Sequence, residues 1–491
     1  MSIDLSLDRI RALLANVRYT RPTIHIAGTN GKGSVSSLVS SILLAASLSV
    51  GRFNSPHLIS VLDSIALNGQ PISAATYASA RETVETLNTV HQIGASNFEL
   101  LTCTALLVFE RAEVDLVVLE VGMGGRLDAT NVIPDECVLV SALTAVDFDH
   151  QAFLGTTVGE IAREKASIAR RGRAFVLGPQ KYAEVGQVVR QLVEDIGGDL
   201  IVATPARKWE QATSVLLPEQ DRGFRRPPPQ SVEVSLSCFE KPILAKLPLY
   251  GDHQLDNLGT ASKIVDALIT HPYCAYRLYL RSRIIPDVLS SGIEKTVWPG
   301  RLSFHDVPLH ILSRVGSQKS GSQDLSNQGM TVLADGAHNP SSSSTLAAYI
   351  SHLLGGLIGT RTIHLTYILA LSHSPPKMPI QTLSPLFSLP LPPNTQVRFS
   401  VAVLGFTPVE GMPWVQPVPP FDLARVVHDL APGADIWQPK NDQESIESQL
   451  RQALKWAGEK QSGGGDPSLV VLAGSLYLVA DFYRLLQDAD E

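Results

Sequence analysis

The stretch Thr23–Ser34, TIHIAGTNGKGS, constrains the fold of this chain more than any other part of it. The run Thr23–Ala27 predicts a short buried strand, and the run SVSSLVSSILLAAS that starts near Ser34 predicts a helix. Between them lies a loop with three glycines, a lysine and a serine. A strand, a glycine-rich loop and a helix in this order are typical of sites that bind phosphate groups.

Each part of this loop has a physical role in the predicted phosphate site. We expect the backbone N–H groups of Gly28–Gly33 to point inward, because glycine tolerates the backbone angles that this requires. The helix N-terminus adds a partial positive charge. Lys32 can reach the outer phosphates of a nucleotide, and the Ser34 hydroxyl can ligate Mg²⁺. The candidate nucleotide-binding residues of the loop are Thr29, Asn30, Gly31, Lys32, Gly33 and Ser34.

The loop departs from the common P-loop in two ways. Ile26 stands where the first glycine would be, and Gly33 separates Lys32 from Ser34. A glycine-rich loop taken alone is often only a tight turn. The lysine, the serine and the following helix favour the nucleotide interpretation over the simple turn.

Composition and charge narrow the class of protein. The chain has 491 residues, of which 44% are hydrophobic and 18% are charged, so it is long enough for two or three globular domains. Its net charge of −7 argues against a nucleic-acid surface spread over the fold. The four cysteines form no CxxC pair, so we expect free thiols in a reducing compartment.

We expect neither a targeting signal nor a membrane-spanning segment. The N-terminal segment carries Asp4 and Asp8, which is unfavourable for a transit peptide and for a secretory signal. The longest apolar run, Ile42–Val50, is too short to span a bilayer. We therefore expect a cytoplasmic protein with no membrane or nucleic-acid partner, and we expect it to be a monomer.

Apolar runs alternate with helical patterns in both halves of the chain. In the N-terminal half, Asp115–Glu120 and Cys137–Ser141 add two predicted strands, and this alternation predicts a parallel sheet with crossover helices. From about Asp306 the pattern restarts, which predicts a second, smaller doubly wound domain. The elements expected there are strands at Thr331–Asp335, His364–Ala370, Ser400–Leu404 and Leu469–Ala473 and a helix at Ser342–Leu354.

A proline and glycine hinge, Trp298–Arg301, marks the expected boundary between domains at residues 1–300 and 301–491. Four further segments are rich in serine, glycine or proline and cannot bury a core, so we expect loops or partly disordered chain there. These segments are Asp221–Gln230, Arg314–Gln328, Pro375–Pro393 and Glu459–Pro467.

Polar residues at the predicted strand ends are site candidates, because ligands of parallel sheets bind at the carboxyl ends of the strands. Glu120 and Thr144–His150 fall at such ends. Glu120 is either a solvated carboxylate or a Mg²⁺ ligand, since Mg²⁺ prefers few carboxylates plus phosphate oxygens. His150 is either a structural hydrogen-bonding residue or a site residue. Lys165 lies on a predicted helix, where lysines are usually solvated.

Six motifs follow one another along nearly the whole chain. They are Phe53–Leu58 (FNSPHL), Leu119–Asn131 (LEVGMGGRLDATN), Asp149–His150 with Leu154–Gly155 and Glu164–Ala166, Gly251–Gln254 (GDHQ) with Asn257, Trp298–Arg301 (WPGR) and Asp335–Pro340 (DGAHNP). Together with GTNGKGS they resemble the Mur-ligase superfamily of ATP-dependent amide ligases. Within it, the ordered set resembles the dihydrofolate synthase and folylpolyglutamate synthase family.

The resemblance implies an α/β fold. A Mur-ligase-like P-loop ATPase domain with a parallel-rich central sheet would occupy residues 1–300, and a smaller Rossmann-like glutamate-ligase domain would occupy residues 301–491. It also implies roles for individual residues. Mg²⁺ would be held by Ser34, Glu120 and His150. Lys165 matches a lysine that is carbamylated in the family, so that it carries a carboxylate that helps to organise the metals.

The remaining implied roles concern the substrates. The positions that match ATP contacts in the family are Asn257, Arg301 and Asp335. His338 would lie near the transferred phosphate. The loop that would shape the pterin-side pocket consists of Ser55, Pro56 and His57.

The resemblance further implies a reaction. ATP would phosphorylate a carboxylate, and the α-amino group of L-glutamate would attack the acyl phosphate. Lys32, Arg301 and Mg²⁺ would neutralise charge on the transferring phosphoryl group. The expected ligands are ATP, Mg²⁺, L-glutamate and either dihydropteroate or a reduced folate. A regulator without catalysis is disfavoured by the complete metal set, and a cell-wall precursor ligase is disfavoured by the SPH and WPGR matches.

Two cues favour dihydropteroate over a folate with a growing glutamate tail. Asn30 stands where eukaryotic polyglutamate synthases usually have lysine, and Phe406–Val415 resembles the fungal dihydrofolate synthase branch. One segment departs from the family pattern. In the family, a loop rich in lysine and aspartate often follows the position of Ala370–Ser372. This chain continues with HSPPK instead, so we assign no contact with the nucleotide base or with glutamate to this loop.

Overall fold

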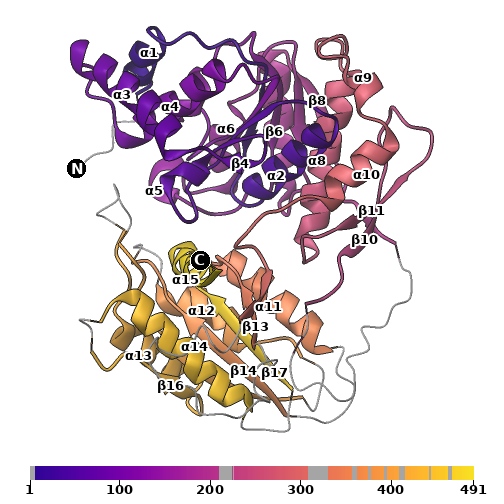
Figure 1. The fold of residues 1–491 in the computed structure, drawn as a ribbon. Coiled ribbons are helices and arrows are strands. Elements are labelled where there is room, and N and C mark those ends of the chain that lie inside the picture. The colour runs from indigo at the N-terminus through magenta and orange to yellow at the C-terminus, as the bar shows by residue number, and fades with distance from the viewer. Residues whose placement is uncertain are drawn as a thin grey trace. The chain divides into compact units, whose positions relative to one another are not determined.

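The computed structural model describes residues 6–209, 224, 226–307, 330–355, 362–373, 378–391, 395–408, 415–441, 444–462 and 467–490 (Figure 1). The chain divides into two compact units, Met1–Gln211 with Pro229–Trp298, and Ala212–Pro228 with Pro299–Glu491. The division after Trp298 falls within the WPGR segment. All four cysteines are free, as predicted. No helix among the described residues is both long enough and apolar enough to cross a bilayer.

An eight-stranded sheet forms the centre of the first unit, in the order β4-β3-β2-β5-β1-β6-β7-β8. The six strands from β2 to β8 in this order run parallel, and only the edge strands β3 and β4 are antiparallel. This arrangement confirms the predicted parallel sheet. The strand bounds are β1 Thr23–Ala27, β2 Val50–Phe53, β3 Ile65–Leu67, β4 Gln70–Pro71, β5 Leu116–Glu120, β6 Val138–Leu143, β7 Ala174–Leu177 and β8 Asp199–Val202.

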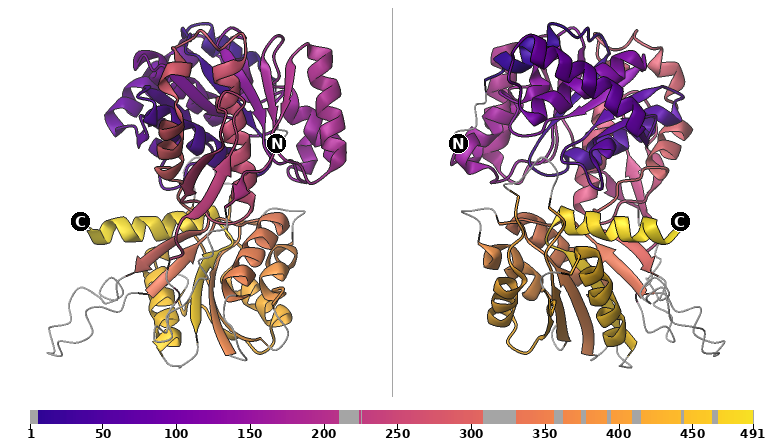
Figure 2. Two further views of the ribbon diagram at one scale, coloured as in Figure 1. Left: turned by 90° about the vertical axis from the view of Figure 1, so that its right-hand side faces the viewer. Right: turned by 60° about the vertical axis from the view of Figure 1, so that its left-hand side comes forward.

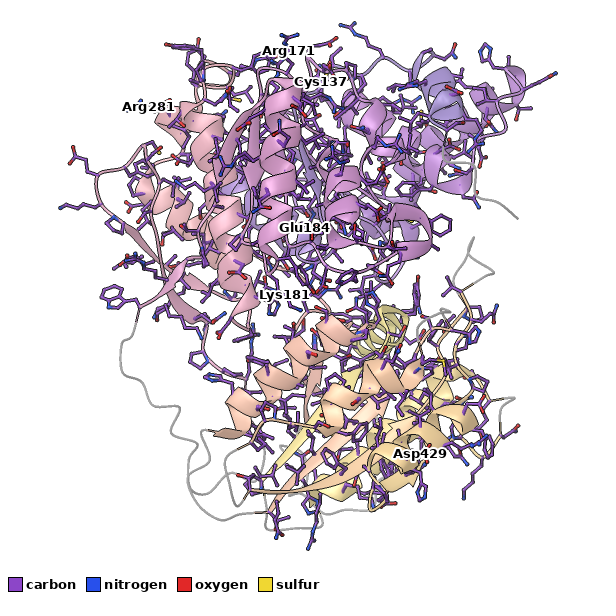
Figure 3. All side chains as sticks on the ribbon, turned by 180° about the vertical axis from the view of Figure 1, so that it is seen from behind. Cys137, Arg171, Lys181, Glu184, Arg281 and Asp429 are labelled. Atoms are coloured by element: carbon purple, nitrogen blue, oxygen red, sulfur yellow. The ribbon has the colours of Figure 1, made fainter. Side chains whose placement is uncertain are left out.

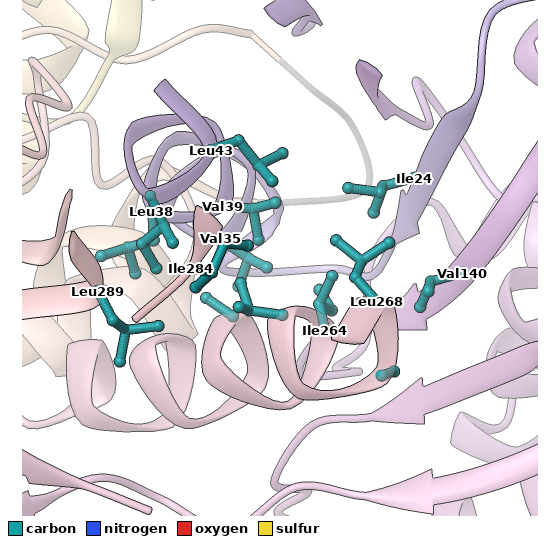
Figure 4. Packing of buried hydrophobic residues seen from close by; sticks show 14 of the residues in the cluster. Ile24, Val35, Leu38, Val39, Leu43, Val140, Ile264, Leu268, Ile284 and Leu289 are labelled. Atoms are coloured by element: carbon teal, nitrogen blue, oxygen red, sulfur yellow. The ribbon is translucent and has the colours of Figure 1, made fainter. Parts of the chain in front are cut away.

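Helices cover both faces of this sheet (Figure 1). On one face, Leu38 of the helix after β1 and Ile264 and Leu268 of a second helix belong to one buried hydrophobic cluster (Figure 4). Each such buried side chain stabilises the fold by roughly 1.5–3 kcal/mol. The helices of this unit are α1 Asp8–Leu14, α2 Lys32–Ala45, α3 Ala74–Val90, α4 Asn97–Arg111, α5 Gln151–Leu154, α6 Val158–Ala166, α7 Ala183–Ile196, α8 His253–Thr270, α9 Leu280–Arg283 and α10 Pro286–Glu294.

Shorter elements complete the first unit. A small antiparallel sheet has the order β11-β10-β9. Its strands are β9 Arg207–Lys208, β10 Gln230–Val234 and β11 Ile243–Leu247. Two 3₁₀ helices, Val61–Ser64 and Ala129–Val132, lie in the connections after β2 and β5.

The second unit has a six-stranded sheet in the order β12-β13-β17-β14-β15-β16, with helices on both faces (Figure 2). All pairs are parallel except β12 with β13, so the predicted doubly wound arrangement is confirmed with an antiparallel edge. Its elements are β12 Ser303–Val307, β13 Met330–Ala334, α11 Pro340–Gly355, β14 Thr362–Leu369, α12 Pro379–Phe387, β15 Gln396–Val403, α13 Pro420–Leu430, β16 Asp435–Trp437, α14 Ile446–Ser462, β17 Ser468–Ala473 and α15 Leu476–Asp490.

The expectation of loops is wrong in three places. Within Pro375–Pro393, α12 forms and buries Leu383 and Leu386. Proline is compatible with the first turn of a helix, so a proline-rich composition does not exclude a helix start at Pro379. The first residues of Glu459–Pro467 belong to α14, and Gln230 begins β10. Arg314–Gln328 and most of the remaining parts lie outside the described residues.

Candidate active site

The loop between β1 and α2 is held in place by the segment that follows β6. The N–H groups of Thr29 and Asn30 both donate to Ala145 O, at 2.9 and 3.2 Å. The Thr144 hydroxyl in turn donates to Asn30 O at 2.7 Å. The prediction that all N–H groups of the loop face a phosphate is therefore wrong for Thr29 and Asn30. A neighbouring strand end occupies these two donors and fixes the loop conformation instead.

The first turn of α2 keeps the features of an anion site. Gly31 precedes the helix with a φ of 91°, a left-handed conformation that favours glycine. A Cβ atom on Gly33 would stand 2.1 Å from Cζ2 of Trp298, so only glycine fits there. No side chain of the described residues caps this helix. The N–H groups of its first turn are therefore open to an anion, as in other phosphate sites at helix N-termini.

Lys32 and Glu120 lie side by side at this turn. Lys32 Nζ donates to the carbonyl oxygens of Gly28 and Thr29, at 3.2 and 3.4 Å, and lies 3.8 Å from Glu120 Oε1. Glu120 ends β5 and is only 5% exposed. Its Oε2 accepts a hydrogen bond from Asn54 Nδ2 at 2.5 Å. Burial excludes the alternative of a solvated strand-end carboxylate.

Lys165 is buried beneath the same loop, although lysines on helices are usually solvated. It is 3% exposed, and its Nζ donates to Gly28 O at 3.0 Å. Burial, together with the nearby charge of Lys32, lowers the pKa of Lys165 to about 7. An amine with this pKa is partly neutral near pH 7 and therefore nucleophilic.

His150 stands at the start of α5 in a left-handed conformation, with a φ of 49°. Its Nε2 lies 3.6 Å from Asp149 Oδ2, and its side chain is 47% exposed. The Asp149 charge opposes the lowering of the Lys165 pKa, so Asp149 also belongs to this region. No three His, Cys, Asp or Glu side chains form a metal-binding group within the described residues. Magnesium binding by Ser34, Glu120 and His150 stays a prediction.

Asn257 joins the phosphate loop from α8. It is 6% exposed, and its Nδ2 donates to Gln254 Oε1 at 2.9 Å. A Cβ atom on Gly31 would stand 2.2 Å from Asn257 Oδ1, so the amide is packed against the loop. The structure thus brings this predicted nucleotide contact to the start of α2.

The loop with Ser55, Pro56 and His57 continues β2. The Ser55–Pro56 peptide bond is cis. The Asp63 carboxylate accepts hydrogen bonds from the N–H groups that follow His57, those of Leu58, Ile59 and Ser60, at 2.7–3.0 Å. These hydrogen bonds fix the backbone of the loop, which directly follows Asn54, the residue that donates to Glu120.

In the second unit, Asp335 directly follows β13 and is buried. Its Oδ2 accepts from the N–H of Leu302 at 2.8 Å and its Oδ1 from the N–H of Ala337 at 2.9 Å. Burial raises the pKa of Asp335, while the charge of Arg301 acts in the opposite direction. A Cβ atom on Gly336 would stand 2.4 Å from Arg301 Nη1. Arg301 and Asp335 are therefore neighbours at a strand end.

His338 lies three residues further along and has a defined tautomer. Its Nδ1 is 2.9 Å from Gly336 O, and because a carbonyl only accepts, Nδ1 carries the proton. The Nε2 atom of the neutral ring is then an acceptor. Asn339 follows and accepts a hydrogen bond at Oδ1 from the N–H of Ser342, at the start of α11.

The described residues thus gather the candidates at strand ends within each unit. Thr29–Ser34, Glu120, Lys165 and Asn257 lie together in the first unit, and Arg301 and Asp335 lie together in the second. Sequence reasoning did not assign Asn54 a role. Because Asn54 directly follows the parallel strand β2, the strand-end argument would have selected it if β2 had been predicted.

A cavity of about 540 Å³ in the second unit holds none of these residues. His364, Arg398 and Asp435 are among its lining side chains. They stand at the amino ends of β14, β15 and β16, whereas Asp335 follows the carboxyl end of β13. Ligands of parallel sheets bind at the carboxyl ends, so this cavity is not a substitute for the predicted site. Asp429, in the last turn of α13, is labelled in Figure 3.

Comparisons with known proteins agree with this arrangement. A family model described as "Dihydrofolate synthetase, C-terminal domain" matches residues 318–485. The chain is 33% identical to the dihydrofolate synthetase of Saccharomyces cerevisiae, with 99% of this chain and 98% of the relative covered. It is 31% identical to a dihydrofolate synthase/folylpolyglutamate synthase of Mycobacterium tuberculosis, with 71% and 67% covered. The solved structure of the Mycobacterium tuberculosis folylpolyglutamate synthase complexed with ADP has a TM-score of 0.71 at 25% identity, covering 99% and 95%.

The fold and the site together define an α/β protein of the Mur-ligase type with a phosphate-binding loop. The likeness to the Saccharomyces cerevisiae relative extends over almost the full length of both chains. The chain belongs to the dihydrofolate synthase/folylpolyglutamate synthase family, whose members are ATP-dependent ligases.

Proposed function

We propose that this protein joins L-glutamate to dihydropteroate, giving dihydrofolate, ADP and phosphate through an acyl-phosphate intermediate. The observation that carries this proposal is the 33% identity to a dihydrofolate synthetase over 99% of the chain. Extension of the glutamate tail of tetrahydrofolate is the second candidate, because other relatives are named folylpolyglutamate synthases as well.

ATP would bind to residues 1–300 at the first turn of α2. The uncapped helix N-terminus and Lys32 Nζ supply positive charge for the phosphates. Asn257, packed against Gly31, would contact the nucleotide from α8. Residues 301–491 would form the glutamate-ligase domain, in which Arg301 and Asp335 would contribute further ATP contacts.

Magnesium would be held by Ser34, Glu120 and His150. The buried carboxylate of Glu120 fits this role, because Mg²⁺ is usually bound by one or two carboxylates plus substrate phosphates. The metal would neutralise charge on the phosphates when it is bound. Lys165 would be carbamylated: its neutral amine attacks the carbon of CO₂ and loses a proton, which leaves a carbamate. Its burial and its lowered pKa support this modification.

The residues of this chain would promote the reaction by positioning and by charge. Lys32 and Arg301 would stabilise negative charge on the phosphoryl group as it moves to the acceptor carboxylate. His338 would donate to the transferred phosphate only when its Nε2 is protonated, since its Nδ1 proton is engaged by Gly336 O. Ser55, Pro56 and His57 would shape the pterin side of the pocket. The amino group of L-glutamate then attacks the acyl phosphate, and phosphate leaves.

Phosphate release tests whether the chain is a ligase. We expect ATP-dependent release of phosphate only when both a pteroate-type acceptor and L-glutamate are present. Nucleotide binding without any such release would favour a regulator that has lost catalysis. We also propose that the protein acts in the cytoplasm as a monomer, which light scattering would report as a mass near 53.0 kDa.

A further inference from the structure

Arg52 on β2 has no carboxylate partner among the described residues. Its Nη1 donates to Ser37 Oγ at 3.2 Å, and its Nε is buried with no hydrogen-bond partner in the part of the chain that the structure describes. The guanidinium carbon lies 5.3 Å from the centroid of the Trp298 ring. The charges of Glu120 and Asp63 stabilise the guanidinium only through space. Apart from its hydrogen bond to Ser37, the guanidinium group of Arg52 therefore interacts mainly with the indole of Trp298.

Trp298 packs against the beginning of α2. Its ring atoms Cζ2 and Cε2 would lie 2.1 and 2.8 Å from a Cβ atom on Gly33, so the indole packs directly on the glycine backbone. One residue earlier, Val297 O accepts a hydrogen bond from Ser37 Oγ at 2.8 Å. The same serine hydroxyl receives the hydrogen bond from Arg52. Arg52, Ser37 and Trp298 thus form one connected group along the first two turns of α2.

We propose that Arg52 is a positioning residue for the phosphate site, which holds the Trp298 indole against Gly33 and so fixes the first turn of α2. The inference rests on the proposed binding of ATP at this turn. A cation within about 6 Å of a tryptophan ring is attracted to its face, and tryptophan is the best aromatic partner for this interaction. If the indole is less firmly held, the N–H groups next to Gly33 lose part of their preorganisation, and nucleotide affinity falls.

Arginine has properties here that lysine lacks. Its planar guanidinium donates in a fixed fork and can lie against an aromatic ring, whereas the lysine ammonium is a compact and strongly hydrated point charge. Arg52→Lys therefore keeps the charge near Glu120 but weakens the connection between Ser37 and Trp298. A merely structural role for Arg52 predicts lower stability and unchanged affinity of the folded protein for nucleotide.

A matched control lies at the other end of the same sheet. Arg173 directly precedes β7, and its guanidinium carbon is 3.2 Å from the centroid of the Tyr273 ring. Arg173→Lys thus perturbs a cation–π contact in the same unit at the amino ends of the strands, away from the phosphate loop. Its neighbour Arg171 is labelled at that end of the unit in Figure 3.

The test is isothermal titration calorimetry with ADP in EDTA, on the full chain and its variants. We expect Arg52→Lys to weaken ADP binding about three- to ten-fold, while Arg173→Lys stays within about two-fold of the unchanged protein. Thermal unfolding of both variants measures any loss of stability separately. Equal ADP affinity in Arg52→Lys and in the unchanged protein would overturn the inference.

A second variant tests whether Arg52 affects ADP affinity through the Trp298 indole. Trp298→Leu should weaken ADP binding by at least as much as Arg52→Lys, and adding Arg52→Lys to it should have no further effect. Additive effects of the two substitutions in the double variant would overturn the inference. If Arg52→Lys does not fold, Trp298→Leu alone decides, and unchanged ADP affinity in that variant overturns the inference. An unchanged protein that does not bind ADP at all would contradict the proposed ATP-binding function itself.

Discussion

Asn54 donates a hydrogen bond from Nδ2 to Oε2 of Glu120 over 2.5 Å. Glu120 ends β5 and Asn54 directly follows β2, and these two strands are parallel neighbours in the sheet. Asn54 Nδ2 also donates to Ser36 Oγ at 2.7 Å, which ties the pair to α2. The proposed magnesium ligand is therefore oriented by an amide that the fold brings to it.

This relationship predicts how magnesium dependence responds to substitution. Asn54→Ala should raise the Mg²⁺ concentration for half-maximal activity about 10- to 100-fold, the usual effect of removing a group that orients a metal ligand. Glu120→Ala and His150→Ala should shift the curve at least as far. The control is Glu113→Gln, which changes an exposed carboxylate shortly before β5. If the Mg²⁺ dependence of activity in Glu120→Ala and His150→Ala coincides with that of the control, neither residue binds the metal and both have only a structural role.

Lys32→Ala should reduce turnover by at least about 100-fold, the scale of losing one charge contact in the transition state. The reason is the position of Nζ over the phosphate loop, 3.2 Å from Gly28 O and 3.8 Å from Glu120 Oε1. Steady-state kinetics with saturating ATP measures the effect, with Lys241→Ala as an exposed control. Near-normal turnover in Lys32→Ala would remove the phosphate role assigned to it.

Lys165→Ala should abolish activity, because it removes both the buried amine and the proposed carbamate. Short carboxylic acids added to this variant should restore part of the activity by supplying the missing carboxylate. Incubation of the unchanged protein with ¹³C-labelled CO₂ should give a carbamate signal that is missing from Lys165→Ala. An active Lys165→Ala protein together with no carbamate signal would refute the modification.

The main parallel strands were predictable because they are buried on both faces and read as continuous apolar runs. Leu116–Glu120 and Val138–Leu143 are buried at every position, and the sequence places both within a residue or two. The parallel strands β2, β7 and β8 and the edge strands β3 and β4 were not predicted, because strands of two to four residues carry little sequence pattern of their own and are defined by their partners. α12 was missed because its buried positions Leu383 and Leu386 stand in a proline-rich context.

Site residues that belong to a sequence motif could be predicted. Properties that depend on burial or on contacts between distant segments could not. Lys165 looks like any helical lysine in the sequence, and only the packing of α6 beneath Gly28 buries it. Thr29 and Asn30 were expected to turn their N–H groups toward phosphate, but Ala145 O accepts both. That contact joins residues far apart in the chain, so no local sequence pattern predicts it.

Burial of His25 predicts a pH dependence of stability. His25 is fully buried in β1, its Nε2 lies 2.8 Å from Thr130 Oγ1, and burial lowers its pKa to about 3. The unfolded chain, with a histidine pKa of about 6.5, binds more protons between these values. The free energy of unfolding must therefore fall as pH falls through this window.

His25→Gln should make this decrease less steep, by up to about 1.4 kcal/mol per pH unit. Urea unfolding at several pH values between 6.5 and 4 measures the slope, and His91→Gln, at an exposed position, is the control. Identical slopes in His25→Gln and in the unchanged protein would show that His25 does not carry the effect.

The identity of the acceptor is the central claim, and it depends on geometry. A dihydropteroate ligase must hold the p-aminobenzoate carboxylate against the γ-phosphate of ATP, whereas an enzyme that extends a glutamate tail must place a terminal glutamate there. The pterin then sits further out, and the two placements compete because proximity of the carboxylate to the phosphate sets the rate. Asn30 is described in the loop, but the cue from Phe406–Val415 lies partly outside the described residues.

The most direct measurement is product analysis with labelled L-glutamate, ATP and Mg²⁺, run in parallel with dihydropteroate and with tetrahydrofolate as acceptors. Chromatography separates a product with one added glutamate from an elongated folate. We predict that dihydropteroate is the preferred acceptor, that it receives a single glutamate, and that one ATP is consumed per amide formed. Efficient elongation of tetrahydrofolate with no use of dihydropteroate would contradict the account.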